Sequence, residues 1–205
     1  MSITKLVDQA LEMGFSPSIV RINYTKAVVA YNAAGNSGAI STITLLDNGD
    51  FNTSNITHDN YMSLSNSLIK LTDTRLVLAY TNDTGPKLKL KVFDIATNGT
   101  LSQTASETYN TAADISLVKL TDNRVVVAYA GSGSDGFIQT FDIAANGAIT
   151  TVTSGVGNNP LEHDTSKGTH NSLIKLSDTR VALAYAGPGD KGYIKTLDIN
   201  SDGTI

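Results

Sequence analysis

The chain has 205 residues, of which 40% are hydrophobic and 17% charged, and its formal net charge at pH 7 is -4. This composition is typical of a globular protein, and the negative charge argues against nucleic acid or an anionic membrane as partner. The lack of cysteine excludes disulfides and thiol chemistry, and no apolar run of about 18 residues is present to span a bilayer.

One sequence pattern occurs four times along the chain. It runs from Asn171 to Gly187 as NSLIKLSDTRVALAYAG, and related segments begin at Pro17, Asn66 and Ile115. Each copy consists of two short apolar runs joined by a polar turn, which predicts a β-hairpin. Because one such hairpin cannot bury its own apolar surface, the copies are expected to stack on one another.

The four hairpins end on equivalent tyrosines, which lie 49, 49 and 56 residues apart: Tyr31, Tyr80, Tyr129 and Tyr185. This period falls in the range of about 40 to 50 residues that is typical of propeller blades. We therefore divide the chain into four repeats of one domain, residues 1–205. The repeats are 17–65, 66–114, 115–170, and 171–205 completed by 1–16.

Each repeat contains four predicted strands, named a to d in chain order. In the second repeat they are 67–71, 75–80, 88–95 and 101–108. Strands a and b are apolar on both faces, which predicts that both faces are covered, whereas strand d is half polar and belongs at the outside. The turns between c and d carry the Gly-containing pairs that tight hairpins require, beginning at Asn48, Asn98, Asn146 and Asp202.

The two ends of the chain complement each other in this pattern. Ile205 aligns with the first residue of strand d in the other repeats, so the last repeat stops before its outer strand. Residues 3–7 have the phase of a strand d, since Ile3 precedes Ile19 by the same 16 residues that separate Leu101 from Leu117. The sequence therefore predicts that 3–7 pairs beside 193–199 and closes a ring.

At these residues the chain resembles the β-propeller superfamily. The segment LSDTRVALAYAG is similar to the L-x-(D/N)-G-R-V-x-V-A-G pattern of kelch-like blades, with Thr or Asn in place of Gly in the turn. The c–d turn resembles the Asp-box of sialidase-type propellers without its Trp. The resemblance implies an all-β fold, a four-bladed β-propeller with the N-terminal strand closing the last blade.

The longer and more variable loops of such a propeller, b–c and d–a, share one face, and this face also carries the insertion 154–170. Function concentrates on variable loops, so we expect the site there. The four tyrosines and the serines that open strand a could stack on a sugar and bind its hydroxyls; the alternative is that the tyrosines pack between blades. The predicted ligand-binding residues are Tyr31, Tyr80, Tyr129, Tyr185, Ser67, Ser116, Ser172, His163 and Asp164.

A second equivalent set lies on the innermost strand and is basic: Arg21, Lys70, Lys119 and Lys175. A central basic ring of this kind could hold an anion. The alternative pairs each cation with an aspartate of the a–b turn or of the end of strand c, because a charge near the core needs a partner.

The acidic and histidine side chains suggest little chemistry. The three histidines, His58, His163 and His170, match no zinc spacing, so we expect solvated loop residues, no metal and no cofactor. Paired carboxylates for glycoside hydrolysis would have to come from a small set: Glu107, Glu162, Asp114, Asp164 and Asp190.

The sequence therefore favours a non-enzymatic recognition module without catalytic residues, with a glycan or protein ligand and no nucleic-acid or membrane partner. Near-equivalence of the repeats supports binding, since catalysis usually needs one repeat to differ. Two alternatives remain open. One is a propeller-type glycan hydrolase or lyase, and the other is a structural component of a larger viral or cell-surface assembly.

Overall fold

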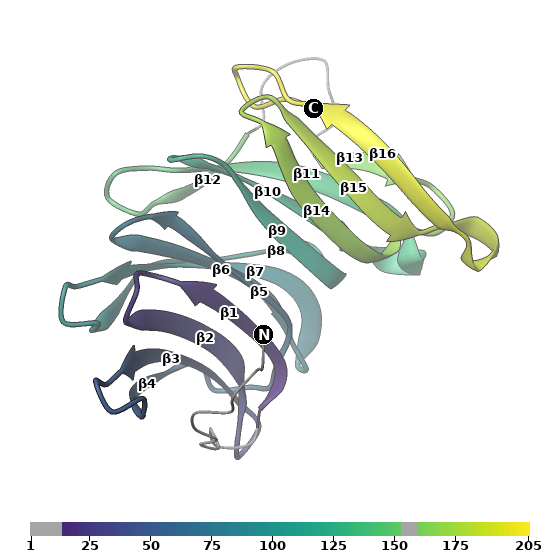
Figure 1. Cartoon of the computed structure of the whole chain (residues 1–205). Coiled ribbons are helices and arrows are strands. Elements are labelled where there is room, and N and C mark those ends of the chain that lie inside the picture. The colour runs from purple at the N-terminus through teal and green to yellow at the C-terminus, as the bar shows by residue number, and fades with distance from the viewer. Residues whose placement is uncertain (1–13, 153–159) are drawn as a thin grey trace, which may run out of the picture.

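The computed structural model describes residues 14–152 and 160–205. This part of the chain is almost entirely β-structure in four antiparallel sheets (Figure 1). Its only helical elements are two short 3-10 turns, η1 (Ser132–Ser134) and η2 (Pro188–Asp190). None of the described helices has the length and apolarity needed to cross a bilayer.

The four sheets follow the chain in order. Sheet 1 contains β1 (Phe15–Arg21), β2 (Lys26–Ala33), β3 (Ser37–Leu45) and β4 (Phe51–Asp59). Sheet 2 contains β5 (Ser63–Thr72), β6 (Arg75–Asn82), β7 (Gly85–Ile95) and β8 (Leu101–Thr111). Sheet 3 contains β9 (Ala113–Thr121), β10 (Arg124–Ala130), β11 (Gly136–Ile143), β12 (Ile149–Thr151) and β13 (Leu161–Asp164). Sheet 4 contains β14 (Thr169–Ser177), β15 (Arg180–Ala186) and β16 (Gly192–Asp198).

The register confirms the predicted hairpins. In sheet 2 the repeated motif pairs Leu68 with Leu78 and Ile69 with Val77, and the next strand pairs Leu76 with Phe93. The turn from β7 to β8 places Gly99 at φ +96°, a conformation that residues with a Cβ rarely adopt. The sequence therefore specifies both the strands and the turns that connect them.

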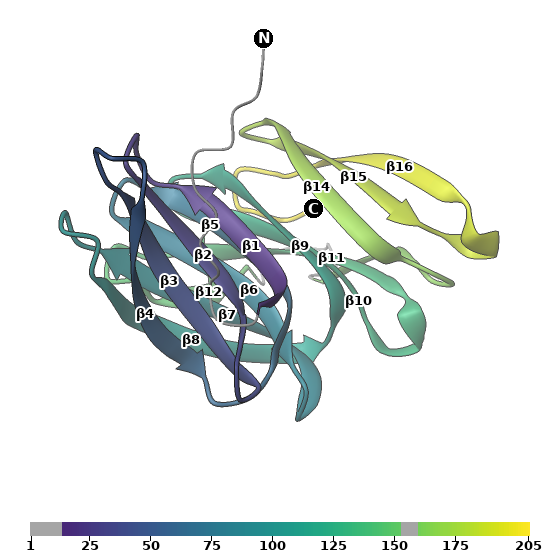
Figure 2. The same cartoon turned by 60° about the horizontal axis from the view of Figure 1, so that its bottom comes forward.

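The sheets stack through their apolar faces, so the core lies in three layers between successive sheets. Val28 and Ile40 of sheet 1 pack in one cluster with Leu76 and Leu78 of sheet 2. The inner strands β1, β5, β9 and β14 lie side by side along the stack (Figures 1 and 2). In sheets 2 and 3 strands a and b are covered on both faces, as predicted, whereas β1, β14 and β15 of the end sheets are exposed on one face. Strand β8, a predicted strand d, is largely exposed.

The described residues form an open fan of sheets with β1 at one end and β14 to β16 at the other (Figures 1 and 2). Ile19 on β1 is 64% exposed, whereas the equivalent Leu68 in sheet 2 is 5% exposed. Sheet 4 has three strands among the described residues, and β16 is its edge. The predicted strand at 3–7 lies outside the described residues, so its pairing with β16 stays a prediction.

Candidate functional site

The four equivalent tyrosines are buried, three of them between sheets and Tyr31 on the face of sheet 1 turned away from sheet 2. Their exposed fractions are between 0 and 4%, so none offers an open ring face for stacking. The Tyr80 hydroxyl donates to Asp59 of the preceding sheet at 2.8 Å, and the Tyr185 hydroxyl donates to Asp164 at 3.0 Å. Tyr129 hydrogen-bonds Asn110 at the equivalent place, and Tyr31 bonds Ser41 within its own sheet. These contacts agree with the alternative in which the tyrosines pack inside the fold and do not bind a sugar.

The serines that open strand a join the inner strands of neighbouring sheets. The Ser67 hydroxyl accepts a hydrogen bond from the Leu117 amide at 3.0 Å, and the Ser116 hydroxyl accepts one from the Leu173 amide at 2.9 Å. Ser172 occupies the same position in sheet 4 and is exposed. The structure therefore separates these serines from any shared ligand site and places each at a different sheet junction.

The basic residues on the inner strands are paired on the opposite side of the fan. Lys70, Lys119 and Lys175 lie 2.6, 2.5 and 2.5 Å from an aspartate three residues on, in the a–b turn. Each also donates to a backbone carbonyl of the preceding sheet, for example Lys70 to Ile22 at 3.0 Å. Arg21 differs, because its guanidinium lies over the Tyr24 ring. Lys70, Lys119 and their aspartates line a pocket of about 390 Å³.

The loop side at sheets 3 and 4 collects several charged side chains around Asp164. Its carboxylate accepts the Ser166 amide at 3.0 Å, the Lys167 amide at 3.1 Å and the Tyr185 hydroxyl. Burial raises the pKa of Asp164, but these hydrogen bonds and the Lys195 charge outweigh burial and lower it. Lys167 also forms an ion pair with Asp190 of η2. Asp164 is therefore held as a carboxylate.

Two of the three histidines are buried, so the expectation of solvated loop residues is wrong for them. His58 and His163 occupy equivalent positions, and each ring packs edge-on against a tyrosine, at 4.8 Å from Tyr80 and 4.7 Å from Tyr185. Burial lowers the pKa of His163 to about 4, with Lys195 adding to the shift, so the ring is neutral at pH 7. His170 is exposed, as predicted.

The contacts between neighbouring sheets differ at one repeat position, the residue on strand c that pairs with the buried tyrosine of strand b. Lys89 on β7 lies opposite Tyr80 and forms an ion pair with Asp59 at 3.2 Å. In sheet 4 the equivalent residue is Tyr193, which stacks on Tyr185 at 5.5 Å between ring centroids. No residue in 14–152 or 160–205 forms an ion pair with Asp164, so this carboxylate is paired less completely than Asp59.

A pocket of about 240 Å³ opens on the same side, between sheets 2 and 3. Its aromatic wall is Phe137, the residue equivalent to Lys89 and Tyr193, stacked on Tyr129 at 5.7 Å. Glu162 on β13 lies directly across from Phe137. The full lining is Asn110, Thr111, Tyr129, Gly131, Ser132, Phe137 and Pro160.

Sequence reasoning named Tyr129 and Glu162 but missed the pocket that connects them. The sequence signal for this pocket is the residue at the start of strand c, which changes between otherwise similar repeats. It is Lys89 in the second repeat, Phe137 in the third and Tyr193 in the fourth. The other candidate acids lie elsewhere: Asp114 accepts the His170 amide at 3.0 Å, and Glu107 is on the outer strand β8. Within the described ranges no cluster of three or more metal-ligating side chains is present.

No protein-family model and no curated protein matches this chain. Among solved structures it is similar to AofleA from Arthrobotrys oligospora, an arginine-to-alanine mutant, with a TM-score of 0.53 and 10% identity. The match covers 88% of this chain and 52% of AofleA. An α-L-arabinofuranosidase from Lactobacillus brevis has a TM-score of 0.43 and 10% identity, over 93% of this chain and 92% of that one. A glycoside hydrolase from Parabacteroides distasonis has a TM-score of 0.45 and 15% identity, over 94% and 71%.

This comparison corrects two expectations. A non-enzymatic, lectin-like recognition module finds no support, because the solved structures include an arabinofuranosidase, a bifunctional GH43 enzyme and a glycoside hydrolase. The expectation that the protein has no enzyme activity finds no support for the same reason. At 10 to 15% identity, the similarity to these solved structures shows the fold alone.

Proposed function

We propose that the four sheets are blades of a propeller and that the protein is a glycan hydrolase acting at the Phe137 pocket. The observation that carries this proposal is the pairing of Glu162 with Phe137 across β13 and β11. Directly opposed residues of an antiparallel pair have side chains on the same face, about 5 Å apart. Glu162 thereby lies beside Phe137, one of the residues that line the pocket.

The lining of the pocket suits a sugar. Phe137 presents an apolar ring, and Asn110 and Ser132 supply an amide and a hydroxyl that can bond to sugar hydroxyls. The volume of about 240 Å³ is below the range of roughly 300 to 1,000 Å³ that drug-sized ligands occupy. A pocket of this size fits one sugar unit at the end or branch of a glycan.

Hydrolysis of a glycosidic bond ordinarily uses two carboxyl groups, one that donates the proton and one that acts as base or nucleophile. Glu162 is the proposed acid. β13 changes register between the residues opposite Phe137 and Gly136, and the Asp164 carboxylate accepts the Tyr185 hydroxyl of sheet 4, so Asp164 faces sheet 4 and not the pocket between sheets 2 and 3. The proposal therefore rests on Glu162.

The test is reducing-sugar release from a panel of aryl glycosides and polysaccharides by the purified protein. Glu162→Gln is expected to lower kcat by about 100-fold or more, because loss of a general acid has this effect. Phe137→Ala is expected chiefly to raise KM, because it removes the wall of the pocket.

Asp83→Asn is the matched control, because Asp83 is an exposed carboxylate in the turn between β6 and β7 of sheet 2. It should leave both constants unchanged. If the wild-type protein releases no sugar from any substrate, or if Glu162→Gln retains the wild-type rate, the proposal is wrong.

A further inference from the structure

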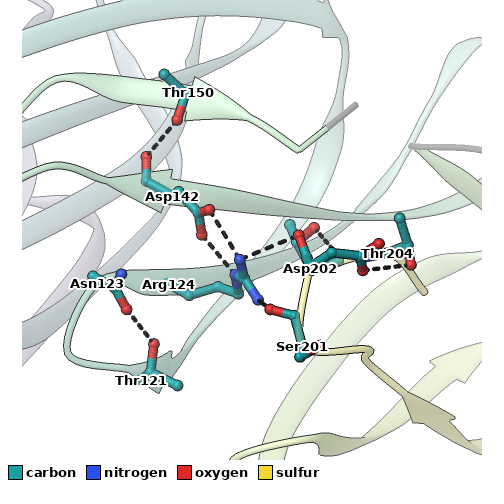
Figure 3. Close-up of polar contacts among 10 residues, drawn as sticks. Thr121, Asn123, Arg124, Asp142, Thr150, Ser201, Asp202 and Thr204 are labelled. Atoms are coloured by element: carbon teal, nitrogen blue, oxygen red, sulfur yellow. Dashed lines mark hydrogen bonds and ion pairs between the residues drawn. The ribbon is translucent and has the colours of Figure 1, made fainter. Parts of the chain in front are cut away.

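Every sheet carries two cations at its turn end, the end that holds the a–b and c–d turns. One lies near the end of strand a and the other opens strand b: Lys70 and Arg75, Lys119 and Arg124, Lys175 and Arg180, and in sheet 1 Arg21 and Lys26. In sheets 2 to 4 each of these cations has an aspartate as partner. The lysine pairs with the aspartate three residues on, and the arginine pairs with the aspartate directly opposite on strand c, as Arg124 does with Asp142 (Figure 3).

Sheet 1 keeps both cations and lacks both acids. Tyr24 follows Arg21 by three residues, and Thr44 lies opposite Lys26, where the other repeats have aspartate. Lys26 donates instead to the Thr97 carbonyl of sheet 2 at 2.6 Å. Arg21 forms no ion pair within residues 14–152 and 160–205, and its guanidinium carbon lies 5.8 Å from the centroid of the Tyr24 ring. Two positive charges at this end of sheet 1 are therefore without the carboxylates that balance their equivalents.

A pocket of about 220 Å³ lies beside Arg21, on the face of sheet 1 turned away from sheet 2. The centre of this face is buried in the single chain, where Tyr31 is 2% exposed, but its turn end is open, where Leu45 is 48% exposed. None of the described residues that line the pocket is acidic, since Asp47 and Asp50 of the adjoining turn are not part of the lining. The pocket at the turn ends of sheets 2 and 3, by contrast, holds two lysines together with two aspartates. The pocket beside Arg21 therefore favours an anionic ligand.

The side chains around this pocket also suit the ring and hydroxyls of a sugar. Tyr24 is 94% exposed, so its flat ring is open to a ligand that stacks on it. The Asn23 Oδ1 atom accepts the Thr25 amide at 2.9 Å, which holds the side chain in place. The Asn23 Nδ2 atom donates no hydrogen bond in the described part of the chain and can donate to a sugar hydroxyl.

We propose that this pocket binds an acidic sugar, a uronic acid unit of a glycan. The Arg21 guanidinium takes the sugar carboxylate where the other repeats supply an aspartate, and it can do so through two parallel hydrogen bonds. The Tyr24 ring stacks on the sugar, and the volume of about 220 Å³ fits one sugar unit. The pocket lies at the turn end of sheet 1, whereas the Phe137 pocket opens on the loop side, so this proposal does not depend on the proposed hydrolase activity.

The test is titration of the ¹⁵N-labelled full chain with D-glucuronate, D-glucose and acetate, followed by the NMR shifts of the backbone amides. We expect glucuronate to bind about tenfold or more tightly than either of the others, because it alone combines a carboxylate with a sugar ring. The shifting amides should lie within 21–27 and 43–51. Equal affinity for glucose would show that the carboxylate is not recognised, and equal affinity for acetate would show that the ring is not; either result overturns the proposal. Shifts at Asn110 and Ser132 instead would place the sugar in the Phe137 pocket, which overturns this proposal and leaves the proposed function standing.

Tyr24→Asp is the most informative variant, because it restores the residue type of the other repeats. Its carboxylate should pair with Arg21 as Asp73 pairs with Lys70, so the affinity for glucuronate should fall about tenfold or more in a folded protein. Arg21→Gln should cause a loss of the same size, and Tyr24→Ser a loss of about fivefold, because it removes the stacking ring. Lys191→Gln is the control, since it removes an exposed cation from the loop side of sheet 4 and should leave the affinity unchanged. Wild-type affinity in Tyr24→Asp or Arg21→Gln, with a native amide spectrum, would overturn the proposal.

Discussion

At the scale of single residues, the buried histidines show how a repeat position is filled. His58 and His163 pack against Gly38 and Gly136, where an added Cβ would lie 2.6 and 2.3 Å from the ring. The equivalent position in sheet 2 is Tyr109, and there β7 has no glycine opposite it. Glycine and histidine therefore occur together because the ring occupies the space that a side chain would need.

His58 leads to a prediction on pH dependence. Burial, with help from Lys91, lowers its pKa to about 3 in the folded protein, against 6.5 in the unfolded chain. The unfolded state therefore binds a proton below pH 6.5 that the native state does not, so stability falls as pH decreases from about 6.5 toward 3. At pH 5 the expected loss is about 2 kcal/mol relative to neutral pH.

The measurement is urea denaturation at pH 7 and pH 5 for the wild type and His58→Gln. The variant should lose about half of the wild-type pH dependence, because the lowered pKa of His163 contributes a similar loss of stability over the same pH range. His170→Gln, at an exposed histidine, is the control and should keep the wild-type slope. An unchanged slope in His58→Gln would contradict the assignment.

At the scale of elements, the sheets are held together by side chains that reach from one strand to the next sheet's turn. Arg124 is largely buried and makes bidentate contact with Asp142, which adds geometric specificity to the charge. Charge-assisted hydrogen bonds raise the pKa of Arg124 further. Arg180 makes the same contact with Asp198, but its side chain is 53% exposed.

These two arginines predict a contrast between matched substitutions. Arg124→Lys should destabilise the fold by about 1 to 3 kcal/mol, because lysine cannot satisfy the carboxylate and two carbonyls together. Arg180→Lys should cost less than about 1 kcal/mol, as exposed ion pairs do. The free energy of unfolding of both variants is measured by urea denaturation. Equal losses of unfolding free energy for the two variants would contradict the proposed role of Arg124 in joining sheets 3 and 4.

At the scale of the whole molecule, the open fan leaves its end sheets supported on one side only. Each sheet needs a neighbour to cover its apolar face, and the first and last have one neighbour each among the described residues. The internal junctions contain the fully buried residues, such as Val77 and Val126. Stability is therefore expected to be lowest at the ends of the fan.

Several features of the fold could be predicted from the sequence because they are local. Alternating and continuous apolar runs, together with Asn-Gly turns such as that at Asn98, specify the strands, their order and their register. The near-50-residue period then specifies stacking of like sheets. The pairing of the inner-strand lysines with aspartates in the next turn could also be predicted, because the lysines and the aspartates recur at the same positions of the repeat.

The candidate site could not be predicted from the sequence in the same way. Glu162 and Phe137 lie 25 positions apart in the sequence, and only the pairing of β13 with β11 makes them neighbours. Likewise, the chemical character of Asp164 depends on Tyr185 of another sheet and on two amides of its own loop.

The sequence by itself determined the strands, the hairpin turns and the number of stacked sheets, because those depend on residues close together along the chain. Only the tertiary structure decided that the described sheets form an open fan, that the tyrosines are buried, and that a pocket opens beside Phe137. Each of these depends on how side chains from different sheets share space, and the repeat pattern is the same whether or not its ends meet.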